Sequence, residues 1–181
     1  MEKDLFGYTK RPRKRKLESA LQKMDSQSFS SRLERLQYLN KIIPKNLGFV
    51  FSVEMHYLLS EAINCLINGQ CVATILLSQS FIEHWLEDKI EQEKVKKQGK
   101  KNLATIVKAM KENNTIQIGL LDKIDRLRKI RNPFVHFKPN EKEFNIVNMS
   151  YFNNQTPEDF LYKEAKNAIS LLYQVSITNF N

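Results

Sequence analysis

Six consecutive residues, Arg131-Asn132-Pro133-Phe134-Val135-His136, hold side chains that can act together on a phosphodiester. Histidine titrates near neutral pH, so His136 can exchange a proton with a ribose 2′-hydroxyl or with a leaving oxygen. The guanidinium of Arg131 presents a fixed fork of donors that can bind phosphate oxygens as negative charge builds on them. Asn132 could donate a hydrogen bond to a phosphate or hold the imidazole in one tautomer. These groups suffice for cleaving RNA without a metal ion.

The spacing of Arg131 and His136 decides whether the two side chains can meet. On a straight helix, five steps of about 100° place them about 140° apart, so they would not share a face. Proline disfavours helical backbone at the residue before it. Asn132-Pro133 therefore predicts a break or kink after Arg131, or else an N-cap and the first residue of a new helical turn. Either arrangement could turn Arg131 and His136 toward one cleft.

The segments around this motif have the periodicity of amphipathic helices, with apolar residues every three or four positions. We expect the main helices at residues 53–68, 70–97, 102–113, 118–131 and 157–176, after a shorter helix that Ser28 or Ser30 caps and that ends near Pro44. Gly69, Asn102 and Thr156-Pro157 supply stop and start signals. Residues 139–156 are polar, and we expect a loop there with a short strand at 144–147. The predicted fold is all-α: an antiparallel bundle of four to five main helices plus a short N-terminal helix.

Composition and charge indicate one helical domain with a basic arm. The 181 residues suffice for a single core, and five Gly and five Pro leave few breaks for a many-stranded β fold. Of the net charge of +9, more than half lies in residues 1–24, which hold eight Lys and Arg against three Asp and Glu. We therefore divide the chain into a flexible basic arm at 1–27 and one domain at 28–181. The arm is either a solvated tail or a phosphate-binding segment; its central cations are Lys10, Arg11, Arg13, Lys14, Arg15 and Lys16.

The cysteines and the hydropathy favour a cytoplasmic protein without a membrane segment. Cys65 and Cys71 are too few for a disulfide framework, and their spacing matches no thiolate pair of a zinc site. No apolar run approaches the length that spans a bilayer, and the first residues are charged rather than apolar. We expect no metal and no other cofactor.

An Arg followed by a polar residue and then, a few positions later, by a His at the end of a helix is the pattern of the HEPN family, which Arg131-Asn132 and His136 resemble. The charged, leucine-spaced residues 124–130 and the helical pair at 53–97 are also similar to the family, so the resemblance covers roughly residues 50–178. Pro133 departs from the unbroken helix that many members carry at this point.

The resemblance implies a helical bundle that dimerises, so that two Arg/His motifs face one another and form a composite, metal-independent RNase site. Carried over to these positions, Arg131 would stabilise the scissile phosphate, His136 would transfer protons and Asn132 would assist. Glu83 could supply an auxiliary acid, although a polar stripe beside Trp85 explains it more simply. Members of the family commonly act as toxins, as anti-phage RNases or in RNA processing.

The sequence therefore predicts a homodimeric endoribonuclease that acts on RNA, in a toxin–antitoxin or anti-phage defence setting, with an antitoxin or other regulatory protein as a further partner. Some members of the family have lost activity. The alternative is accordingly a non-catalytic, HEPN-like RNA-binding, nucleotide-binding or assembly protein that uses the basic arm.

Overall fold

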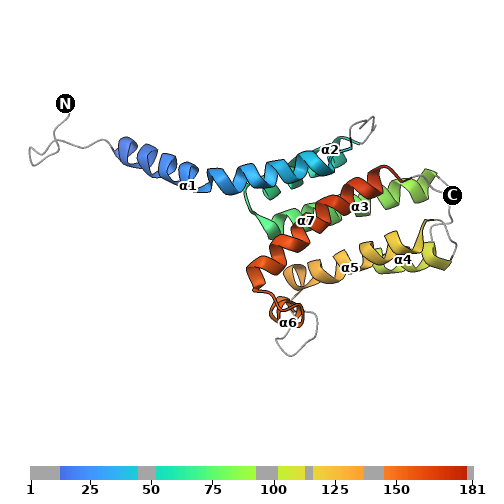
Figure 1. Ribbon diagram of the computed structural model, residues 1–181. Helices are drawn as coiled ribbons and strands as arrows, with labels where there is room; N and C mark the ends of the chain where they lie inside the picture. Colours follow the sequence, from blue (N-terminus) through green and yellow to red (C-terminus); the bar gives the residue numbers. More distant parts are fainter. Residues whose placement is uncertain (1–12, 45–51, 93–101, 113–115, 137–144, 179–181) are drawn as a thin grey trace, which may run out of the picture.

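The computed structural model describes residues 13–44, 52–92, 102–112, 116–136 and 145–178, and every regular element within them is a helix (Figure 1). In chain order the helices are α1 (Arg13–Ile42), α2 (Val53–Ile67), α3 (Cys71–Gln92), α4 (Leu103–Glu112), α5 (Ile118–Val135), α6 (Ile146–Phe152) and α7 (Pro157–Ser176). The predicted all-α bundle is confirmed. None of these described helices is both long enough and apolar enough to cross a bilayer.

Helix α3 is the centre of the bundle, because it packs against α2, α5 and α7. Its side chains Ile75, Phe81 and Leu86 are fully buried, and removing such apolar surface from water is the main stabilising contribution to a fold of this kind. The three neighbouring helices each contribute fully buried residues, among them Leu66, Leu121, Ile124, Ile169 and Leu172. Helices α2 and α3 run in opposite directions, as their short connection predicts (Figure 1).

Three predicted helix boundaries follow directly from local hydrogen bonding and backbone conformation. The carbonyl oxygen of the Asn102 side chain accepts from the N–H of Thr105 at 3.0 Å, which caps α4. Thr156 caps α7 in the same way, and Pro157 occupies the first turn. Gly69 follows α2 with φ at 76°, the left-handed conformation expected after a helix end. These starts and stops are confirmed.

Helix α1 begins earlier than predicted, at Arg13 rather than at Ser28 or Ser30, and is 30 residues long rather than short. The serines inside it do not cap a helix. The Ser28 hydroxyl donates to the carbonyl of Asp25 at 3.2 Å, and the Ser31 hydroxyl donates to the carbonyl of Ser28 at 2.9 Å. These bonds to the preceding turn let serine remain within a helix. Residues 13–27 of the expected arm are therefore helical, and residues 1–12 lie outside the described residues.

Residues 146–152 form helix α6, so the predicted loop is wrong there, as is the strand over 146–147; residues 153–156 are non-helical, as predicted. Asn145 caps it: its side-chain oxygen accepts from the N–H of Asn148 at 2.8 Å. The helix has only seven residues, too few for apolar periodicity to be recognised. Phe144 lies outside the described residues.

Candidate active site at the end of α5

Helix α5 continues through Asn132 and Pro133, so the break predicted there is wrong, as is a new helix starting at Asn132. The N–H of His136 donates to the carbonyl of Asn132 at 2.9 Å, which closes the last turn. Proline lacks an N–H, so Pro133 removes one hydrogen bond, but it does so near the end of the helix where little structure depends on it. His136 is the C-cap residue, with extended backbone.

A continuous helix places Arg131 and His136 on different sides of α5. Arg131 follows Ile124 and Leu127 at the spacing of one helical face, and those two residues are buried against the bundle. Arg131 itself is half-buried, whereas His136 is exposed. Five steps of regular helix would separate two side chains by about 140°, and the backbone of His136 itself is extended rather than helical. No hydrogen bond joins the two side chains within the described residues.

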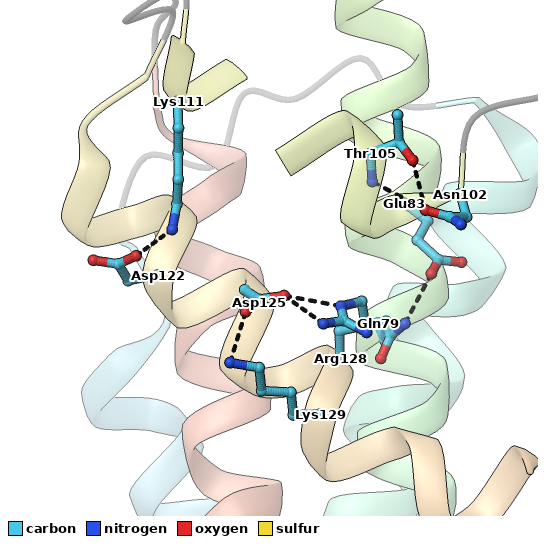
Figure 2. Close-up of polar contacts among 9 residues, drawn as sticks. All are labelled: Gln79, Glu83, Asn102, Thr105, Lys111, Asp122, Asp125, Arg128 and Lys129. Carbon is cyan, nitrogen blue, oxygen red and sulfur yellow. Dashed lines mark hydrogen bonds and ion pairs between the residues drawn. The ribbon is translucent and has the colours of Figure 1, made fainter. Parts of the chain in front are cut away.

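Helix α5 carries three arginines, and two of them are neutralised by carboxylates. Arg126 donates from both of its terminal nitrogens to Glu164 on α7, at 2.6 and 2.7 Å. Its pKa is raised, chiefly because of these hydrogen bonds. Arg128 donates from Nε to Asp125 at 2.9 Å (Figure 2). Within the described residues Arg131 has no hydrogen bond or ion pair, so it is the arginine of this helix that an anion can reach.

Asp125 lies between two cations on its own helix. Arg128 and Lys129 both contact it, the latter at 3.0 Å from Nζ to Oδ2 (Figure 2). Burial by itself raises the pKa of Asp125, but the hydrogen bonds from the two cations outweigh that effect and hold the pKa below its ordinary value. Asp125 is thus a charged counter-ion for its neighbours, and Arg131 has none among the described residues.

Glu83, the predicted auxiliary acid, belongs to a polar layer between α3, α4 and α5 (Figure 2). Its Oε1 accepts from Nε2 of the buried Gln79 at 2.8 Å. Figure 2 shows Gln79 beside Arg128, with Glu83 one turn farther along α3 toward Asn102. Because α3 and α5 run in opposite directions (Figure 1), Glu83 lies farther from Arg131 than Gln79 does. The structure does not bring Glu83 to the Arg131–His136 motif.

The basic run of the predicted arm forms the first turn of α1, which contains Arg13, Lys14, Arg15 and Lys16, while Lys10 and Arg11 lie outside the described residues. Lys16 is exposed. This turn is at the end of α1 that extends past the bundle, away from the end of α5 (Figure 1). The basic run and the Arg131–His136 motif are therefore separate surfaces of the chain.

A cavity of about 260 Å³ between α5 and α7 is lined by residues that were not predicted from the sequence. The Arg126–Glu164 pair lines it, and Lys123 Nζ donates across it to Gln174 Oε1 at 3.0 Å. Arg126 and Glu164 are 38 positions apart, so no local sequence pattern predicts their contact. Arg131, Asn132 and His136 do not line this cavity.

No protein-family model, no curated protein and no solved structure matches this chain. The part of the chain that the structure describes gathers no three His, Cys, Asp or Glu side chains that could hold a metal ion.

Proposed function

We propose that this chain is a metal-independent endoribonuclease of the HEPN type, which cleaves RNA as a homodimer. The observation that carries the proposal is the environment of two residues at the end of α5. Arg131 is half-buried with no counter-ion among the described residues, and His136 is exposed just beyond it. A partly desolvated guanidinium without a carboxylate is stabilised by an anion such as a phosphate.

The residues have distinct parts in the proposed reaction. The ribose 2′-hydroxyl attacks the neighbouring phosphorus, a 2′,3′-cyclic phosphate forms and the 5′-oxygen leaves. His136 accepts the hydroxyl proton or delivers one to the leaving oxygen. Arg131 binds the non-bridging oxygens as their charge increases, and the Asn132 amide donates a further hydrogen bond.

A second copy of the chain completes the site in this proposal. The two side chains face different sides of one helix, so a phosphate held by Arg131 of one protomer meets His136 of its partner. A two-fold axis then produces two identical composite sites.

Incubation of purified protein with total RNA in EDTA tests the activity. We expect fragments that end in a 2′,3′-cyclic phosphate or a 3′-phosphate. His136→Ala and Arg131→Ala should each lower the cleavage rate by at least about 100-fold, because each removes a group that acts in the transition state. Lys108→Ala is the control, since this lysine on α4 is exposed and its one ion pair among the described residues is with Glu112, at 3.9 Å. Cleavage by His136→Ala at the wild-type rate would refute the proposal.

Mixing the two inactive variants tests the composite site. Refolding Arg131→Ala together with His136→Ala gives heterodimers in which one site keeps both groups. The mixture should therefore recover roughly a quarter of the wild-type rate, because half of the dimers are mixed and each holds one intact site of two. No recovery would mean that one protomer supplies both residues.

The basic first turn of α1, in which Lys16 is exposed, favours a second candidate, a non-catalytic HEPN-like protein that binds RNA or nucleotides or acts in assembly. It predicts strongly salt-dependent RNA binding that survives His136→Ala and is lost when residues 1–24 are deleted. A toxin–antitoxin or anti-phage setting, with a protein that restrains the enzyme, remains part of the first proposal. It predicts that wild-type protein arrests growth on expression whereas Arg131→Ala does not.

A further inference from the structure

Two aromatic side chains of α6 are exposed to solvent. Tyr151 is 77% exposed and Phe152 is 70% exposed, and their ring centres are 6.1 Å apart in an edge-to-face arrangement. Figure 1 shows α6 at the same end of the bundle as the C-terminus of α5, which carries Arg131 and His136. Large exposed aromatic side chains next to one another indicate a binding surface.

The turn that follows this pair forms one wall of a cavity of about 740 Å³, a volume typical of ligand sites. The turn is held against α6 by two backbone hydrogen bonds, from Asn154 N–H to the Tyr151 carbonyl at 3.0 Å and from Gln155 N–H to the Ser150 carbonyl at 3.1 Å. The aromatic pair is thus directly followed by the turn that lines part of the cavity. The cavity is lined by Tyr38, Asn154, Gln155, Thr156, Asp159, Tyr162, Lys163, Lys166 and Asn167.

The lysines of this cavity are free to meet an anion. Lys166 Nζ lies 4.4 Å from the ring centre of Tyr38 and 5.2 Å from that of Tyr162, and it has no ion pair within the described residues. Lys163 is exposed and has no ion pair within the described residues. The one acid that lines the cavity, Asp159, already accepts a hydrogen bond from the Thr156 hydroxyl at 2.8 Å.

The amides of the cavity supply hydrogen-bonding groups of the kind that read a base edge. The Oε1 atom of Gln155 is buried and has no hydrogen-bond partner in the described part of the chain. A buried acceptor without a donor is costly, so a rotation of this side chain that turns Oε1 into the cavity to accept an N–H from a ligand would be favourable. Asn154 and Asn167 add further donors and acceptors.

We propose that this aromatic–lysine surface, consisting of Tyr151, Phe152 and the cavity beside them, binds unpaired nucleotides of single-stranded RNA. Bases stack on the two exposed rings, one base edge meets Gln155, and Lys163 and Lys166 contact the phosphates. A duplex would hide its base edges and faces, so the occupant is single-stranded. The choice of RNA rests on the proposed function, but the surface is distinct from the Arg131–His136 motif.

The test is fluorescence anisotropy with a labelled single-stranded RNA, in the full-length His136→Ala protein so that cleavage does not interfere. Each exposed test residue has a matched control of the same type on another surface: Tyr151→Ala with Tyr57→Ala, Phe152→Ala with Phe29→Ala, and Lys163→Ala with Lys108→Ala. The controls are also exposed, at 63% for Tyr57, 59% for Phe29 and 79% for the Lys108 side chain.

We expect the two aromatic test variants to raise the Kd about 5- to 100-fold, which is the range for loss of one stacked base. Lys163→Ala should also raise the Kd, and it should make the Kd less dependent on salt concentration. Gln155→Leu should also weaken binding. The controls should leave the Kd unchanged, and a duplex of the same sequence should bind more weakly.

Three outcomes would overturn the inference: absence of RNA binding, equal losses in test and control variants, or unchanged affinity in the aromatic variants. Unchanged affinity together with a change of oligomeric state would identify the surface as a contact between copies of the chain. Because binding and cleavage are measured separately, RNA that binds to this surface in His136→Ala but is not cut by the wild-type protein refutes the proposed function alone. RNA that is cut while these variants bind normally refutes this inference alone.

Discussion

The carboxylate of Glu164 illustrates how one buried charge can depend on a single partner. Its side chain is 2% exposed, and that of Arg126 is 51% exposed. Both terminal nitrogens of the arginine donate to it, while the Asn167 amide is at 3.5 Å. Taking away the arginine would leave a negative charge in the core with almost no compensation, which is the costly way to break an ion pair.

We therefore predict that Arg126→Met lowers the free energy of unfolding by about 2 kcal/mol, below the range for fully buried pairs because the arginine is half in water. Urea denaturation near neutral pH measures it. Lys108→Met is the control, since an exposed pair contributes about 0–1 kcal/mol. Adding Glu164→Gln to Arg126→Met should recover much of the loss, because a neutral amide is easier to bury. Equal losses of unfolding free energy in Arg126→Met and Lys108→Met would contradict the prediction.

The same residues show what sequence can and cannot predict about a site. Arg131, Asn132 and His136 are neighbours in the chain, so their combined chemistry is evident from the sequence. The absence of a counter-ion for Arg131 depends on which acids other arginines have taken, and one of those acids comes from α7. Glu83 was a sequence candidate, but its distance from Arg131 depends on how α3 and α5 are aligned.

At the scale of single helices, the predictions succeeded where a cap residue acts on its own neighbours. Asn102 and Thr156 each cap the helix that immediately follows, so no distant contact is needed to locate α4 or α7. The predicted start of α1 was wrong because a serine hydroxyl can form a hydrogen bond inside a helix as well as at its N-cap. Helix α6 was not predicted because its seven residues are too few to show apolar periodicity. The helix is stabilised by packing against α7.

Replacing each of two glycines with alanine should change the free energy of unfolding in opposite directions. Gly69 has φ at 76°, and an added Cβ would lie 3.3 Å from an Arg35 guanidinium nitrogen, whereas a Cβ on Gly119 would meet nothing within 4 Å. We expect Gly69→Ala to lower the free energy of unfolding by about 1–2 kcal/mol, through left-handed strain and disturbance of the Arg35 hydrogen bond to the Ile67 carbonyl. Gly119→Ala, in the first turn of α5, should raise it by about 0.5 kcal/mol.

Urea denaturation of both glycine variants, with the slope of the transition compared to wild type, checks these signs. A neutral Gly69→Ala would mean that the turn after α2 accepts another conformation. Loss of stability in Gly119→Ala would mean that the first turn of α5 does not gain from a better helix former.

For the whole molecule, the chain divides between a packed bundle and a helix that is mostly outside it. The bundle was predictable because apolar periodicity identifies the helices and short connections make neighbours antiparallel. The extent of α1 was not, since the basic run at its start predicts a flexible arm rather than a helix. Its first described buried residue is Leu39, and earlier apolar side chains such as Leu21 and Met24 are 60% and 65% exposed. Figure 1 shows this part of α1 extending past the bundle.

Deleting residues 1–27 should therefore leave the stability of the bundle within about 0.5 kcal/mol of wild type, because surface changes away from packed features rarely cost more. The deletion keeps the contacts of α1 with the rest of the chain, among them the Arg35 bond to the Ile67 carbonyl and the Tyr38 bond to the Lys166 carbonyl. Leu39→Ala is the contrasting variant, since a fully buried leucine costs about 2–5 kcal/mol when truncated. Urea denaturation monitored by far-UV circular dichroism measures both. If the deletion destabilised the bundle as much as Leu39→Ala does, the first half of α1 would have to be packed rather than free.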